Sequence, residues 1–231
     1  MRYLLILIFM LVISSYTFAD SKTKYKDQPI TTSAKSLDSQ IKPYVEMAKK
    51  SYPKAKERFM NGLGNNYSFY VIIRIYDEKN NFEQIFLVVD RIRDGYIHGR
   101  LSNNPTRVKK YKRNDKLSVR EENIYDWVIV DPKGEEEGNF VGRYIDAIQN
   151  RYLPLIIKIT IDKDGSVSKS EFSIAVTQQK QDISYIIPQE IQKLAENKAK
   201  LLKFKSEGKT VIRYTYFIYD IHKNQIIEKK K

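Results

Sequence analysis

Only two histidines occur in the 231 residues, and one of them, His98, lies in a glycine-flanked stretch that could hold a general base. A histidine can take up and return a proton near neutral pH, and a carboxylate such as Asp126 or Glu121 would orient its ring. Nothing in the sequence brings these three side chains together. The sequence therefore names no catalytic residue, although an envelope hydrolase or transferase that uses His98 stays open as an alternative.

The sequence also lacks the residues on which most metal and cofactor sites are built. It contains no cysteine, which excludes disulfides, thiol nucleophiles and zinc sites made from cysteine pairs. His98 and His222 lie far apart, which leaves too few soft ligands for a transition-metal site. It has no phosphate-binding glycine loop and no nucleophile in a tight glycine turn. We therefore expect neither a metal nor a cofactor.

Residues suited to binding are more abundant than residues suited to catalysis. Six of the ten residues from 107 to 116 are basic. Such a run can follow the charges of an anionic polymer, and on an edge strand lysines also prevent aggregation between strands. The candidate binding cations are Arg107, Lys109, Lys110, Lys112 and Arg113.

Three aromatic side chains complete the set of candidate binding residues. Trp127 is the only tryptophan and lies within an apolar stretch, so a core anchor is its default role and a place in a binding groove is the alternative. Tyr214 and Tyr216 belong to the aromatic stretch 210–221 near the end of the chain.

The first nineteen residues have the layout of a secretory signal peptide. Arg2 precedes an uncharged apolar run, and Thr17 and Ala19 supply the small residues before a cleavage point after Ala19. An uncleaved anchor is the alternative, because a spanning helix needs about 17–25 such residues. We expect cleavage and a periplasmic or secreted protein with no stable transmembrane anchor. In that compartment the net charge of +13 favours an envelope protein or an anionic envelope polymer as partner over nucleic acid.

The pattern of apolar residues predicts the elements that must position these side chains. We expect a helix over 44–61, five strands over 67–76, 84–93, 96–101, 116–120 and 124–130, and a short helix near 140–148. The pattern restarts near Asn150 with strands over 155–161 and 167–176, a helix over 188–203 and a strand over 210–221. The fold class is therefore expected to be α+β, with two small modules, each an antiparallel sheet packed with one or two helices.

The expected domain organisation follows from these elements. A signal peptide over 1–19 precedes a flexible polar spacer over 20–42, a first module over 43–149, a second module over 150–223 and a basic tail over 224–231.

Several residues of the first module carry a resemblance to a known family. They are Asp94, Gly95, Gly99, Asn104, Pro105, Asp115, Ile124, Asp126, Trp127, Gly138 and Arg143. With the preceding helix and strand, they make residues 44–146 resemble the YegJ-like family of bacterial domains of unknown function. The resemblance implies a compact α+β domain and no established activity.

The second module shows a different resemblance. Its residues are Pro154, Ile156, Lys158, Thr160, Asp164, Gly165 and Val167, followed by Lys203, Phe204, Gly208 and Lys209 before the last strand. Residues 151–222 look like the carboxy-terminal domain of TonB and TolA. The proline-rich linker of TonB is absent, so its energy-transducing role is not implied. The resemblance implies an exposed last strand that can pair with a partner's strand.

The sequence thus favours a non-catalytic binding module of the cell envelope. It would act through a sheet edge near Thr210–Ile221 or through the basic stretch Arg107–Lys116. The envelope enzyme that uses His98 is one alternative, and an immunity-type protein that neutralises a toxin is the second.

Overall fold

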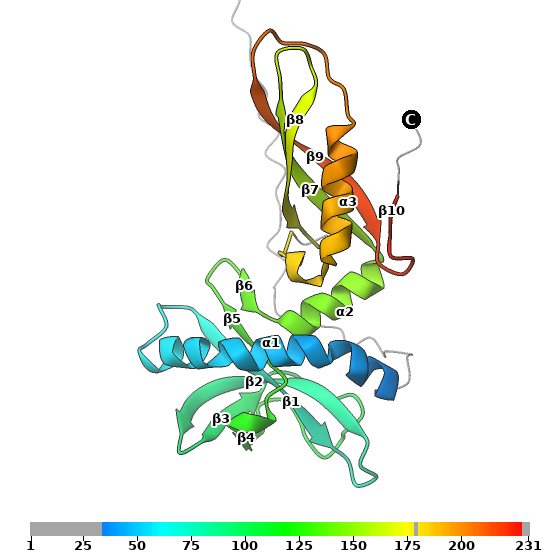
Figure 1. The fold of residues 1–231 in the computed structure, drawn as a ribbon. Helices are drawn as coiled ribbons and strands as arrows, with labels where there is room; N and C mark the ends of the chain where they lie inside the picture. Colours follow the sequence, from blue (N-terminus) through cyan, green and yellow to red (C-terminus); the bar gives the residue numbers. More distant parts are fainter. Residues whose placement is uncertain (1–33, 178–179, 228–231) are drawn as a thin grey trace, which may run out of the picture. The chain divides into compact units, whose positions relative to one another are not determined.

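The computed structural model describes residues 34–177 and 180–227, which form two antiparallel sheets with helices packed against them (Figure 1). This confirms the expected α+β class and the two small modules. The expected signal peptide over 1–19, residues 20–33 of the expected spacer and the last four residues lie outside the described part. None of the described helices is long and apolar enough to cross a membrane.

The first sheet has six strands in the order β4-β3-β2-β1-β5-β6. Its elements are α1 (Ala34–Met60), β1 (Ser68–Tyr76), β2 (Phe82–Arg93), β3 (Tyr96–Leu101), β4 (Lys116–Arg120), the short 3-10 helix Glu121–Asn123, β5 (Asp126–Val130), β6 (Glu136–Gly138) and α2 (Phe140–Asn150). Buried and less buried residues alternate along most of β2, as the geometry of a strand with one face in the core requires. Helix α1 lies across that face (Figure 1) and contributes Ala48, Tyr52 and Ala55 to the core.

Helix α1 begins earlier than the sequence pattern predicts. It starts at Ala34 and passes through both Pro43 and Pro53, so residues 34–42, which we expected to be a flexible spacer, are helical. Ile41 is buried, so its packing favours a helix in a stretch whose local sequence does not predict one. Tertiary packing therefore extends the helix.

An arginine on β1 joins the start of α1 to the sheet. The Arg74 guanidinium forms a salt bridge with Asp38 of α1. Its central carbon lies 3.8 Å from the ring centre of Phe82 and 4.1 Å from that of Tyr125. The cation therefore lies against two aromatic faces, an arrangement that favours its partial burial.

The stretch 94–105 forms the turn after β2, strand β3 and the start of the connection to β4. Asp94 and Gly95 both have positive φ, as a tight hairpin turn with right-handed strand twist requires. Gly99 on β3 lies so close to β2 that a Cβ atom there would be 2.1 Å from the carbonyl oxygen of Val88. The absence of a side chain at this position is therefore a condition for the pairing of β2 and β3.

Replacing Gly99 with alanine should lower the free energy of unfolding by about 1–3 kcal/mol, because the two strands must move apart. Gly64→Ala is the control, since its Cβ would meet only the Tyr67 ring at 3.2 Å. Urea denaturation of both variants measures the difference. Equal stability of the two variants would contradict the close approach at Gly99.

The second sheet has four strands in the order β10-β9-β7-β8. Its elements are β7 (Tyr152–Ile161), β8 (Val167–Ala175), the 3-10 helix Ser184–Ile186, α3 (Gln189–Lys200), β9 (Val211–Asp220) and β10 (Gln225–Ile227). Helix α3 packs on one face through Ile191, Ala195 and Ala199. Strand β10 corrects the expected basic tail over 224–231, because Gln225–Ile227 pair with β9 and Ile226 packs against the core.

Candidate functional site

The structure does not bring His98 to either carboxylate that the sequence offered as its partner. His98 lies on β3, and its Nδ1 is 2.7 Å from the hydroxyl of Ser118 on β4. Asp126 is completely buried in β5, and Glu121 binds the ammonium group of Lys56 at 2.9 Å. The arrangement that a histidine general base with a carboxylate orienter would need is therefore not formed in the described residues.

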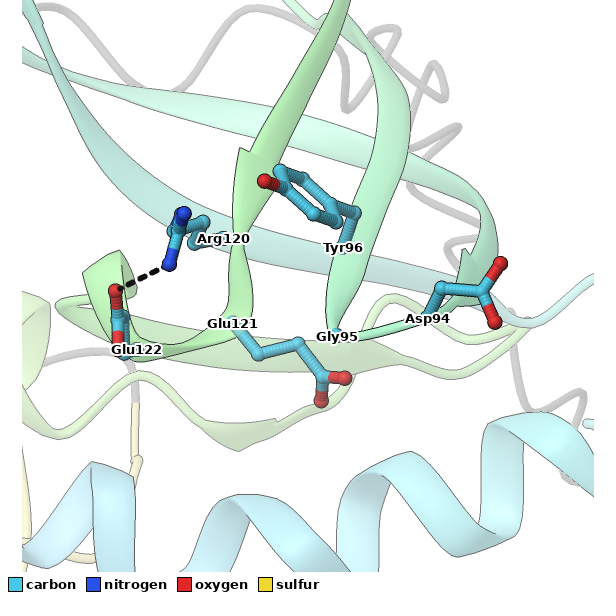
Figure 2. Close-up of a pocket in the computed structure, with 6 residues that line it drawn as sticks. All are labelled: Asp94, Gly95, Tyr96, Arg120, Glu121 and Glu122. Atoms are coloured by element: carbon cyan, nitrogen blue, oxygen red, sulfur yellow. Dashed lines mark ion pairs between the residues drawn. The ribbon is translucent and has the colours of Figure 1, made fainter.

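A surface depression lies beside the turn between β2 and β3 (Figure 2), and its charged groups are satisfied within the chain. It is lined by Asp94, Gly95, Tyr96, Arg120, Glu121 and Glu122. Arg120 forms an ion pair with Glu122 at 3.6 Å, and Asp94 binds Arg93 at 3.0 Å. We assign no ligand to this depression. Within the described ranges, no three His, Asp or Glu side chains gather in a way that could hold a metal ion.

The connection between β3 and β4 presents the basic residues that the sequence singled out. We call residues 104–113 the basic loop. All five of its candidate cations, Arg107, Lys109, Lys110, Lys112 and Arg113, are exposed. No ion pair in the described part of the chain involves these five side chains. Their positive charges are therefore available to a partner.

A buried carboxylate on β2 holds the basic loop in place. Glu83 is 7% exposed and accepts hydrogen bonds from the backbone N–H groups of Thr106 (2.7 Å), Arg107 (2.8 Å) and Val108 (3.1 Å). Burial alone would raise the pKa of Glu83, but these N–H donors lower it below its usual value. Sequence reasoning missed Glu83, although a lone acidic residue at an inward position of an apolar strand was a usable signal.

Trp127 is a core residue and presents no surface to a partner. It is 3% exposed, and its indole N–H donates to the carbonyl oxygen of Ala48 (3.1 Å) and to the hydroxyl of Ser51 (3.0 Å). The ring also meets Phe140 edge to face. Trp127 therefore has the core role that the sequence favoured over a place in a binding groove.

Asp126, the neighbour of Trp127, joins β5 to the start of α2. Its carboxylate accepts hydrogen bonds from the backbone N–H groups of Trp127 (2.8 Å) and Val141 (2.7 Å). Burial raises the pKa of Asp126 to about 7, although both hydrogen bonds and the nearby Arg143 act in the opposite direction. The position at the first turn of α2 makes this carboxylate a structural group at the end of a helix.

Strand β9 places the two candidate tyrosines on the sheet face opposite α3. Ile212, Tyr214 and Tyr216 are 60%, 64% and 52% exposed. Strand β7 lies along one side of β9, whereas the described part of β10 pairs only with Ile218–Asp220 on the other side. The start of β9 therefore has strand neighbours on one side only among the described residues.

The hydrogen-bond pattern shows which backbone groups point to this open side. The β7–β9 register pairs Tyr152 with Asp220, so the next pair along the two chains is Arg151 with Ile221. The N–H of Ile221 donates a hydrogen bond to the carbonyl oxygen of Arg151. Backbone groups of alternate residues point to opposite sides of an antiparallel strand. Val211, Arg213 and Thr215 therefore bond with β7, while the N–H and C=O groups of Ile212 and Tyr214 point away from it.

Comparison with known proteins finds that the first module is similar to one family of conserved bacterial proteins. Residues 38–151, slightly under half of the chain, match the model of a family described as "Uncharacterized protein conserved in bacteria (DUF2314)". The matched range includes the basic loop, Glu83 and Trp127, and it excludes β9. No curated protein and no solved structure matches the chain. The comparisons give no support to the YegJ name or to the TonB and TolA resemblance of residues 151–222.

Proposed function

We propose that the protein is a non-catalytic binding module of the bacterial cell envelope that pairs with a strand of an envelope protein along the start of β9. The observation that carries this proposal is the open side of Val211–Thr215, along which the structure places no strand from residues 34–177 or 180–227. Backbone N–H and C=O groups there can bond with an added strand, and the exposed side chains of Ile212 and Tyr214 can contact its residues.

Three edge strands of the two sheets, β4, β6 and β8, carry features that oppose strand addition. Edge strand β4 is short and carries Lys116 and Arg120, and β6 has only three residues, two of which are glutamates. Strand β8 carries Lys169 and Glu171, and its register with β7 shifts twice. Charges, short lengths and bulges are the usual protections of an edge strand.

The start of β9 lacks those protections. Between Val211 and Thr215 the only charged residue is Arg213, which forms a salt bridge with Glu207 of the same chain. An exposed edge whose single charge is already paired within the chain is a template for pairing with another strand. The contrast with the other edges supports a binding role for this one.

The leader sequence supports the envelope as the place of action. Its single arginine, apolar run and small residues before position 20 are typical of export signals. A chain without cysteine cannot form wrong disulfides under the oxidising conditions outside the cytoplasm. Under this proposal the mature protein meets its partner in the periplasm or beyond it.

Photo-crosslinking in intact cells tests this proposal. With a photo-reactive amino acid at Tyr214, we expect a covalent adduct with another envelope protein. The same amino acid at Tyr76, which is 43% exposed on β1, is the control and should give no such adduct. A cytosolic location of the full-length protein, or identical products from both positions, would overturn the proposal. A toxin as the single stoichiometric adduct would support the immunity-type form of the binding role.

Two proline variants test whether the backbone edge carries the pairing. Ile212→Pro removes an N–H group that points to the open side, so it should abolish the adduct and change stability by less than about 1 kcal/mol. Arg213→Pro removes an N–H group that bonds with β7 and should lower the free energy of unfolding by about 1–3 kcal/mol. An adduct that survives Ile212→Pro would show that side chains alone hold the partner.

A further inference from the structure

The basic loop carries an inference that does not depend on β9. We propose that the basic loop is a binding site for a linear, phosphate-bearing polyanion, and that Glu83 positions the loop for this ligand. The loop lies in the first module, and no described contact joins it to β9. The two surfaces can therefore be tested separately.

The loop has a defined shape because side chains hold its backbone at both ends. At its start, Glu83 binds three consecutive N–H groups, and Val108 is completely buried in the core. At its end, the Asn104 side chain accepts a hydrogen bond from the N–H of Arg113 at 2.8 Å. Asp115 accepts one from the N–H of Lys112 at 2.9 Å. The five cations therefore project from a preorganised frame, which reduces the entropy lost when a ligand binds.

Two carboxylates accept hydrogen bonds from the backbone of the basic loop. Glu83 and Asp115 accept hydrogen bonds from main-chain N–H donors and form no ion pair with the loop cations. The buried carboxylate of Glu83 therefore shapes the loop, while the five cations of the loop remain exposed. Exposed lysine and arginine side chains without acidic partners attract phosphate groups strongly at low ionic strength.

The surroundings of the loop favour a narrow chain over a flat anionic membrane. The turn between β1 and β2 carries Asp77, Glu78 and Lys79, a net negative charge, and it lines the same surface depression as Arg107 and Lys110. A planar anionic surface that reached the loop would also approach these two carboxylates and be repelled by them. Val108 is buried, so it offers no apolar side chain for insertion into lipid. A linear polyanion can lie along the cations and avoid the acidic turn.

Binding of inorganic polyphosphate to the mature protein, followed by calorimetry or fluorescence anisotropy, tests the site. Replacing Lys109, Lys110 and Lys112 together with glutamine should weaken binding at least tenfold. It should also reduce the slope of log K against log salt by about 2, since each lost phosphate contact removes about 0.7. The matched control replaces Lys163, Lys193 and Lys200, three exposed lysines of the second module, and changes the net charge equally. Equal loss in both variants would overturn the proposal, because net charge alone would then explain binding.

Glu83→Gln separates loop shape from charge. This variant makes the protein one charge more positive, so association driven by charge alone should strengthen. We expect several-fold weaker binding instead, because the amide NH₂ group, a donor, replaces one of the two carboxylate oxygens that accept from the N–H groups of Thr106, Arg107 and Val108. Thr106→Val, which removes only the hydroxyl bond to Glu83 at 3.1 Å, is the milder variant if Glu83→Gln does not fold. Unchanged or tighter binding in the folded variants would contradict the positioning role.

Two further ligands distinguish the sources of phosphate. Millimolar inorganic phosphate should compete weakly with polyphosphate, because a single phosphate contacts only part of the loop. Vesicles that contain phosphatidylglycerol should bind less tightly than polyphosphate at equal phosphate concentration. Tighter binding to the vesicles, lost in the variant with glutamine at 109, 110 and 112, would assign the loop to a membrane surface and overturn the proposed ligand.

Discussion

Trp127→Ala should lower the free energy of unfolding by about 3–5 kcal/mol, the range for removing a large aromatic side chain from a core. The ring is almost completely buried between α1 and Phe140. Its removal leaves a cavity and also takes the indole donor away from the Ala48 carbonyl and the Ser51 hydroxyl. Urea denaturation followed by circular dichroism measures the loss, since the variant lacks the tryptophan that fluorescence would report.

Trp127→Phe is the control that separates volume from hydrogen bonding. It keeps part of the aromatic packing and removes the indole N–H, so its loss should be clearly smaller than that of the alanine variant. If Trp127→Ala kept wild-type stability and instead lost a partner in the crosslinking experiment, the residue would belong to a binding groove. Because the ring is buried, we expect the loss of stability and not the loss of a partner.

The sequence predicted five of the six strands of the first sheet, because most of them are local runs of β-branched and aromatic residues bounded by turn residues. The stretch from Gln84 to Arg93 begins with the apolar run Ile85–Val89, and β2 extends the predicted strand by only two residues. The ends of the fold were harder to predict. The start of α1 depends on the buried Ile41 and on the Asp38–Arg74 pair, which joins residues far apart in the chain. Strand β10 has only three residues and depends on its pairing with β9.

The same distinction between local and long-range information applies to the candidate sites. The run of cations in the basic loop is visible in the sequence, but the carboxylate that shapes the loop precedes it by more than twenty residues. The sequence likewise predicted β9 as a strand, but the open side of Ile212 and Tyr214 follows from strand order, which apolar patterns do not encode. Trp127 remained ambiguous in the sequence because an apolar strand suits both a core and a groove.

Asp126 should make the protein less stable as the pH rises from about 4 to about 7. Its pKa in the folded protein is raised to about 7 by burial, whereas an unfolded chain has the ordinary value near 3.8. The folded state therefore binds a proton more tightly than the unfolded state throughout this window. The stabilisation is complete below the unfolded pKa and is lost as the pH passes the folded pKa. A shift of roughly three pH units corresponds to at most about 4 kcal/mol.

Asp126→Asn isolates this effect because it cannot titrate. Asp146 and Glu136 also act on the local charge, but they are present in both proteins and cancel in the difference. Between pH 4 and pH 8 the free energy of unfolding of wild type minus that of Asp126→Asn, from urea titrations at each pH, should fall by a few kcal/mol.

A difference that stayed flat or rose with pH would show that Asp126 is ionised throughout. The hydrogen bonds from Trp127 and Val141 and the position at the first turn of α2 would then outweigh desolvation. The sign of the slope therefore decides whether desolvation or hydrogen bonding has the larger effect on the pKa of Asp126. A falling difference makes that junction weaker in neutral than in mildly acidic surroundings.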